Sequence, residues 1–281
     1  GRSGDDMAAG FAVRAPSSVG WRGGFSTTRI ESNFDPALGF IRRRGIEQTN
    51  FDVGYQWRPM RGAIRTLSTG VDFERIEYLD KGDIQSESTR FQLLNINLNS
   101  QDGFNLNYNR DREGIRVPFE ISQGITIEPG LYTFDGFTIG YRAGNQRAFS
   151  GGVFLTEGDF YDGQRNSYNL FLNMRPNRHF RSNLRYQYNE IMLPGGRFET
   201  RVVQLTLEAV FSSTLSWTNL IQYDNVSETI GINSRLHWIP RAGREGFLVL
   251  NHNLQDFDNR DNNFKSSFSE TTLKYSYTFR F

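Results

Sequence analysis

The stretch Val202–Phe211, "VVQLTLEAVF", alternates between apolar and polar side chains. Its apolar positions are Val203, Leu205, Leu207, Ala209 and Phe211, and its polar positions are Gln204, Thr206 and Glu208. Successive side chains of a β-strand point to opposite faces of a sheet, so this period of two predicts a strand with one apolar and one polar face. The stretch is longer than an ordinary globular strand of about 5–6 residues and close to the roughly 9–11 residues of a tilted membrane-crossing strand.

The same alternation recurs along almost the whole chain, whereas helical periodicity is hard to find. The stretch 103–110, "GFNLNYNR", is a second example, with Phe104, Leu106 and Tyr108 opposite three asparagines. We predict an all-β fold with about fourteen antiparallel strands between residues 19 and 281. Residues 7–14 resemble the end of one more strand, followed by a turn up to residue 18. On that interpretation the sheet has further strands before Gly1.

The connections between the predicted strands alternate between short and long. Short turns at one end and long loops at the other are typical of an outer-membrane β-barrel. The short turns are mostly basic, and several long loops are acidic. We therefore predict a transmembrane barrel over residues 19–281, with extracellular loops at 30–46, 75–86, 111–134, 157–165, 191–198 and 256–269.

The composition excludes several other classes of protein. A net charge of +1 gives no basic field, so we expect no nucleic-acid partner. The absence of cysteine excludes disulfides, thiol nucleophiles and cysteine-based zinc sites. The mean hydropathy of −0.56 suits a soluble protein, yet 14% of the residues are aromatic. No apolar run approaches the roughly 20 residues of a membrane helix, which leaves membrane-crossing strands, since only every second residue of such a strand is apolar.

A soluble β-sandwich also alternates and remains the alternative. The membrane interpretation is favoured by tyrosines and tryptophans near the ends of several apolar rows, including Trp21, Trp57, Trp217 and Trp238, as in interfacial aromatic girdles. The chain ends on "YTFRF", where Tyr277, Phe279 and Phe281 resemble the signal read by the barrel-assembly machinery. These features predict the bacterial outer membrane, a periplasmic C-terminus, and contacts with membrane lipid and lipopolysaccharide.

Several stretches resemble one family, in order along nearly the whole chain. They are "NFDPALGFIRR" (33–43), "PFEI" (118–121), "IEPGLYTF" (127–134), "GDFYDG" (158–163), "LPGGRF" (193–198), "INSRLHW" (232–238), "FLVLN" (247–251) and the closing "YTFRF". The family comprises large Gram-negative outer-membrane proteins whose N-terminal domain is similar to a family-nine carbohydrate-binding module and whose C-terminal barrel is a domain of unknown function. The resemblance implies a barrel in the outer membrane and no established reaction. The carbohydrate-binding module is not part of this chain.

Two groups of residues are candidates for function. The loop group is predicted to contact a glycan or protein partner, and comprises Asp35, Arg42, Arg43, Asp159, Tyr161, Asp162 and Arg197. The alternative is that these aromatic and Gly/Pro-rich loops pack against one another. The lumen group is predicted to point into the barrel, and comprises Asn105, Asn107, Arg185, Gln204, Glu208, Arg235, His237, Lys274 and Arg280.

No catalytic residue, cofactor or metal site is expected. Asp159 and Asp162 lack the ligand spacing of a calcium loop, and no His/Asp/Glu spacing suggests zinc. His237 has no Ser or Asp beside it on its strand, which favours a hydrogen-bonded histidine over a catalytic base. Three functions remain open: a channel or surface platform for binding and uptake, with carbohydrate as one candidate solute; a structural or assembly component with a plugged lumen; and an outer-membrane hydrolase.

Overall fold

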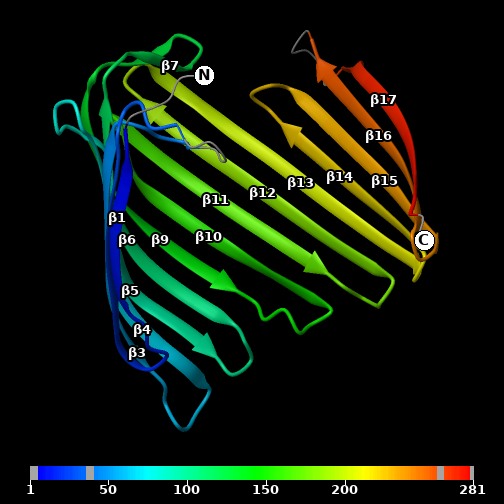
Figure 1. Ribbon diagram of the computed structural model, residues 1–281, viewed down its shortest axis with the longest axis horizontal. Coiled ribbons are helices and arrows are strands. Elements are labelled where there is room, and N and C mark those ends of the chain that lie inside the picture. Colours follow the sequence, from blue (N-terminus) through cyan, green and yellow to red (C-terminus); the bar gives the residue numbers. More distant parts are fainter. Residues whose placement is uncertain (1–5, 36–40, 258–262, 279–281) are drawn as a thin grey trace. The chain divides into compact units, whose positions relative to one another are not determined.

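The computed structural model describes residues 6–35, 41–257 and 263–278, and all regular elements in these ranges are β-strands (Figure 1). The strands are β1 (Ala8–Ala15), β2 (Gly20–Ile30), β3 (Ile46–Trp57), β4 (Ile64–Tyr78), β5 (Ile84–Leu98), β6 (Gly103–Ile115), β7 (Phe119–Ser122), β8 (Ile125–Ile127), β9 (Gly130–Arg142), β10 (Phe149–Phe160), β11 (Gly163–Met174), β12 (Phe180–Leu193), β13 (Gly196–Ser212), β14 (Leu215–Asp224), β15 (Thr229–Arg241), β16 (Arg244–Asp256) and β17 (Phe264–Tyr277).

Fifteen of the described strands form one sheet, in which each strand pairs with its neighbour in the chain. The order runs from β1 to β17, and only β7 and β8 are set aside as a separate two-stranded sheet between β6 and β9. The pairings are antiparallel, as expected where short turns join consecutive strands. The predicted all-β antiparallel class is confirmed, and the strand end predicted at 7–14 is β1.

The strands extend further than the alternating apolar rows predicted. The ranges 75–86, 157–165 and 191–198 were predicted as loops, but each is mostly strand around a short turn. The reason is that polar residues continue the ladder beyond the apolar rows, as in the pairing of Arg75 with Glu87. In the range 111–134, β6 continues to Ile115 and the hairpin β7–β8 follows. Parts of the other two predicted loops, residues 36–40 and 258–262, lie outside the described residues.

The described chain divides into two compact units. Unit 1 comprises residues 1–141, 156–166 and 191–198, and unit 2 comprises residues 142–155, 167–190 and 199–281. The buried apolar cluster of unit 1 is small and consists of Ile125, Ile127, Ile191 and Leu193. Ile125 and Ile127 belong to β8. The small hairpin is therefore held by side-chain packing and not by backbone pairing with the main sheet.

Burial is sparse for a chain of this size. Among the described residues only six apolar side chains are buried, and no large side chain is fully buried. The same residues include many exposed large apolar side chains, such as Trp21 (72% exposed) and Leu273 (79%). The long strands are therefore held together mainly by their backbone ladders and cross-strand neighbours.

The described residues contain no helix that is both long and apolar enough to cross a membrane.

Candidate functional site

The pairing register arranges the side chains of unit 1 in rows that cross β2 to β6, the strands coloured blue to green in Figure 1. One row consists of Gly23, Val53, Val71, Phe91 and Tyr108. The next consists of Gly24, Asp52, Asp72, Arg90 and Asn109. Adjacent rows point to opposite faces, so this part of the sheet has one apolar and one polar face.

Unit 2 repeats this arrangement across β13 to β17. Its apolar row consists of Ala209, Trp217, Leu236, Leu248 and Leu273, and the adjacent row consists of Glu208, Thr218, Arg235, Val249 and Thr272. The separation of apolar from polar side chains is incomplete in unit 2, because Val249 and Phe247 lie in rows of the polar face. On the apolar face, Ser234 accepts a hydrogen bond from the Trp217 indole nitrogen at 2.9 Å.

Most of the predicted lumen residues occupy polar rows. Asn105 and Asn107 of β6 lie opposite Asn95 and Gln92, and Gln204 of β13 lies opposite Gln222. Glu208 and Arg235 share the row given above, Lys274 lies opposite Phe247, and Arg185 is exposed on β12. Arg280 lies outside the described residues, as do Phe279 and Phe281 of the predicted assembly signal. Tyr277, the last residue of β17, accepts a hydrogen bond from Arg244 at 3.1 Å.

His237 has a carboxylate partner that its own strand did not reveal. Its Nε2 lies 3.2 Å from Oε2 of Glu245, and its ring stacks on Phe247 with centroids 4.2 Å apart. Both partners come from β16, across the hairpin that follows Arg241. Ser216 lies opposite His237 on the other side, in β14. The histidine is therefore held between two neighbouring strands on the polar face.

The predicted loop residues fall into separate groups. Asp35 forms an ion pair with Arg44 at 2.7 Å, and Arg43 donates to the Ser86 hydroxyl at 3.3 Å, while Arg42 is exposed. Arg197 lies near the start of β13. Oδ2 of Asp159 accepts a hydrogen bond from the backbone N–H of Asp135 at 3.3 Å, and Asp162 is exposed. Within the described ranges no group of three or more His, Asp or Glu side chains is placed to hold a metal ion.

Tyr161 lies at the centre of an aromatic cluster in unit 1. Its ring contacts those of Phe119, Tyr132, Phe134 and Phe160, with centroids 4.7–6.1 Å apart. Its hydroxyl donates to Glu113 at 3.0 Å. Burial, together with the Glu113 charge and hydrogen bond, raises the pKa of the Tyr161 phenol above its ordinary value. These contacts join 111–134 to 157–165, which supports the predicted alternative that the loops pack against one another.

A second contact, which sequence reasoning missed, ties the start of the β7–β8 segment to the β4–β5 turn. Arg116 makes two hydrogen bonds to Asp80, at 2.7 and 2.9 Å, and one to Asp83 at 2.9 Å. Its guanidinium also lies 3.6 Å from the centroid of the Tyr78 ring. The Arg116 hydrogen bond holds the pKa of Asp80 below its ordinary value. The acidic composition of 75–86 was the only signal in the sequence, and it did not identify the partner.

No protein-family model matches this chain, and no curated protein matches it. The resemblance based on sequence motifs therefore remains an expectation.

Proposed function

We propose that this chain forms the wall of an outer-membrane β-barrel, in which the polar face lines a water-filled passage for polar solutes. The observation that carries the proposal is that, in each of the two units, the strands present an exposed apolar face and a polar face. In a membrane the apolar rows would contact lipid, while closure of the sheet would satisfy the backbone groups of its edge strands.

The exposed apolar rows are more stable in contact with lipid than in contact with water. Transferring a Leu or Phe side chain out of water contributes about 1.5–3 kcal/mol, whereas ordering each residue's backbone costs about 1–2 kcal/mol. Only six apolar side chains are buried among the described residues, so the sheet gains little of this stabilisation from its own interior. Contact between the exposed rows and lipid chains would supply the missing stabilisation.

The aromatic residues agree with this proposal. Trp21 and Tyr55 lie directly opposite each other at one end of β2 and β3, with ring centroids 5.2 Å apart. Both rings are exposed. Amphipathic rings at the end of an apolar band match the interfacial girdles of membrane barrels.

The packed loops of unit 1 favour a role in stabilising one end of the proposed barrel. Tyr161 was predicted to contact a ligand. Instead its hydroxyl donates a hydrogen bond to Glu113, and its ring packs against the rings of other loop residues. These contacts assign the Tyr161 cluster to loop packing rather than to ligand binding, and the channel proposal rests on the two faces of the sheet.

Reconstitution of the complete protein into planar lipid bilayers tests this proposal. We expect insertion from detergent and stepwise single-channel currents. A protein that inserts but passes no current would contradict the open passage and favour the plugged structural component. A protein that stays monodisperse in water without detergent would contradict the membrane assignment itself.

A further inference from the structure

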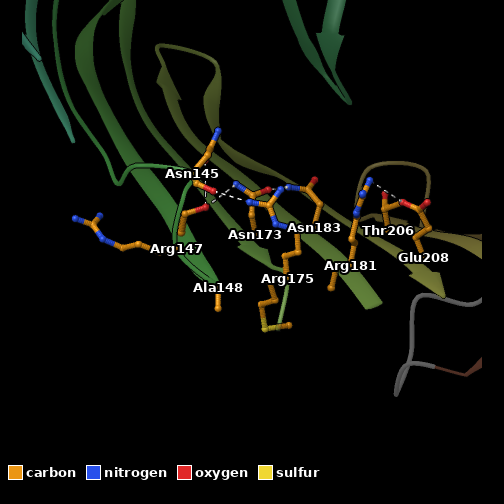
Figure 2. Close-up of a pocket in the computed structure, with 12 residues that line it drawn as sticks. Asn145, Arg147, Ala148, Asn173, Arg175, Arg181, Asn183, Thr206 and Glu208 are labelled. Carbon is orange, nitrogen blue, oxygen red and sulfur yellow. Dashed lines mark hydrogen bonds and ion pairs between the residues drawn. The ribbon is translucent and has the colours of Figure 1, made fainter. Parts of the chain in front are cut away.

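Unit 2 contains a cavity of about 350 Å³ on its polar face, next to the turns that precede β10 and β12 (Figure 2). Its charged lining residues are Arg147, Arg175, Arg181 and Glu208. Glu208 lies in a polar row of β13, and its ion pair with Arg181 places that arginine on the same face. Arg175 and Arg181 together carry more positive charge than the single Glu208 carboxylate balances, so this part of the cavity is electropositive.

The two best-defined guanidinium groups keep donors for a ligand. Arg175 donates to the backbone carbonyl of Asn145 at 2.9 Å, a neutral acceptor that leaves its charge in place. Arg181 lies 3.9 Å from the nearest oxygen of Glu208, which is beyond hydrogen-bond distance. Arg175 has no carboxylate partner among the described residues, and a guanidinium presents five N–H donors in a planar fork that matches carboxylate and phosphate groups.

A chain of polar side chains fixes the floor beside these arginines. Asn183 donates to Asn173 at 2.6 Å, Asn173 to Ser150 at 3.5 Å, and Ser150 to Asn145 at 3.2 Å, as the dashed lines in Figure 2 show in part. Ser150 is buried, so this chain is anchored in the sheet. Side-chain amides both donate and accept hydrogen bonds, which suits hydroxyl groups next to an anionic group.

We propose that this cavity binds a small organic oxyanion, with Arg175 and Arg181 holding its carboxylate or phosphate group and the asparagines contacting its neutral polar groups. The binding site does not depend on the proposed channel. Only its consequence, that the passage conducts anions in preference to cations, rests on that proposed function. The excess of positive charge distinguishes this cavity from an acidic one in unit 1. A polar-face cavity in unit 1, of about 430 Å³, contains Asp52, Asp72 and Glu74 against Arg90.

Binding to the purified protein in detergent tests the site without any requirement for conduction. The probes are gluconate, glucose 6-phosphate, inorganic phosphate and neutral glucose, each titrated by calorimetry. We expect gluconate or glucose 6-phosphate to bind more tightly than glucose. Arg181→Gln should weaken that binding about tenfold, since charge-assisted hydrogen bonds are roughly twice as strong as neutral ones. Arg175→Gln should act in the same direction.

Arg90→Gln, in the acidic cavity of unit 1, is the matched control and should leave the binding unchanged. Circular dichroism should verify that each variant is folded. Equal affinity for glucose and the anions, or unchanged anion binding in both Arg175→Gln and Arg181→Gln, would overturn the proposed site. Stronger binding of inorganic phosphate than of either organic anion would overturn the assigned ligand class.

The reversal potential in a salt gradient tests the consequence for conduction. We expect anion preference in the wild type and a shift towards cations in the Arg175→Gln/Arg181→Gln double variant. A conducting protein whose reversal potential does not change would contradict the anion-selective passage. Absence of any current would contradict the proposed channel instead, and the calorimetric result alone would then decide the binding site.

Discussion

At the scale of single residues, Tyr161 combines several constraints at one position. Its backbone has a φ of 51°, which is uncommon for a residue other than glycine. It occupies the two-residue turn between β10 and β11, where its ring meets four other aromatic rings. The cost of this backbone conformation is offset by the packing and by the hydrogen bond to Glu113.

Tyr161→Phe keeps the ring and removes this hydrogen bond. We expect a loss of about 1 kcal/mol in the free energy of unfolding, measured by urea titration in lipid vesicles. Tyr161→Ala should lose more, because it also removes the ring contacts. Tyr168→Phe is the control, since the Tyr168 hydroxyl has no hydrogen-bond partner among the described residues. A cost for Tyr161→Phe no greater than that of the control would show that the Glu113 contact contributes nothing.

The raised pKa of Tyr161 adds a pH dependence. Its value in the folded protein lies above that of unfolded tyrosine, about 10. The stability from the neutral phenol is therefore present below about pH 10 and is lost as the pH rises through the folded-state pKa. The difference in unfolding free energy between wild type and Tyr161→Phe should shrink over that range. A constant difference across the range would contradict the raised pKa.

At the scale of elements, the hairpin β7–β8 depends on contacts at its two ends. Arg116 ties its start to the β4–β5 turn, and Ile125 and Ile127 pack against Ile191 and Leu193. Arg116→Gln loses the bidentate contact with Asp80. We expect faster amide hydrogen exchange in 116–129, measured by mass spectrometry, with little change in β14 and β15.

Arg22→Gln, on the polar face of β2, is the control for that experiment. Unchanged exchange in 116–129 would show that apolar packing alone holds the hairpin. Protonation of Asp80 should also release it. Because the pKa of Asp80 is lowered in the folded protein, the stabilisation is present above the ordinary carboxyl range and is lost as the pH falls through the folded-state value.

Gly163, the first residue of β11, allows a close approach to β12. A Cβ at this position would overlap the backbone carbonyl of Met192, so Gly163→Ala must displace one of the two strands. We expect a loss of about 1–3 kcal/mol in unfolding free energy, as for other overpacked sites. Gly231→Ala is the control, because the atom nearest to a Cβ at that position would be the side-chain oxygen of Asn253, 3.5 Å away. Equal stability of the two variants would contradict this close approach.

The positions of the strands could be predicted from the sequence. The residues at which the strands end, and the side-chain contacts between strands, could not. Alternation in Val202–Phe211 identified β13 and its two faces, because period two depends only on the local backbone. It could not predict that the strands of 75–86 continue into a short turn, since polar residues form the same ladder without an apolar signal. Nor could it pair His237 with Glu245, because that contact depends on the register across a hairpin.

At the scale of the whole molecule, a barrel in a membrane requires the apolar face of the sheet to meet lipid and the polar face to meet water. The chain has no cysteine, so single labels can be introduced without a background. Along β13, residues 205, 207 and 209 belong to apolar rows and residues 204, 206 and 208 to polar rows. A lipid-facing strand should therefore alternate in its exposure to lipid with the same period of two.

The most direct measurement is a scan of single cysteines from 204 to 209 in the protein reconstituted in lipid vesicles, each carrying a fluorescent label. Labels at 205, 207 and 209 should be quenched by a quencher attached to the lipid chains, and those at 204, 206 and 208 by a water-soluble one. Quenching by the aqueous reagent alone at all six positions, or with no period of two, would contradict the assignment of the apolar face to lipid.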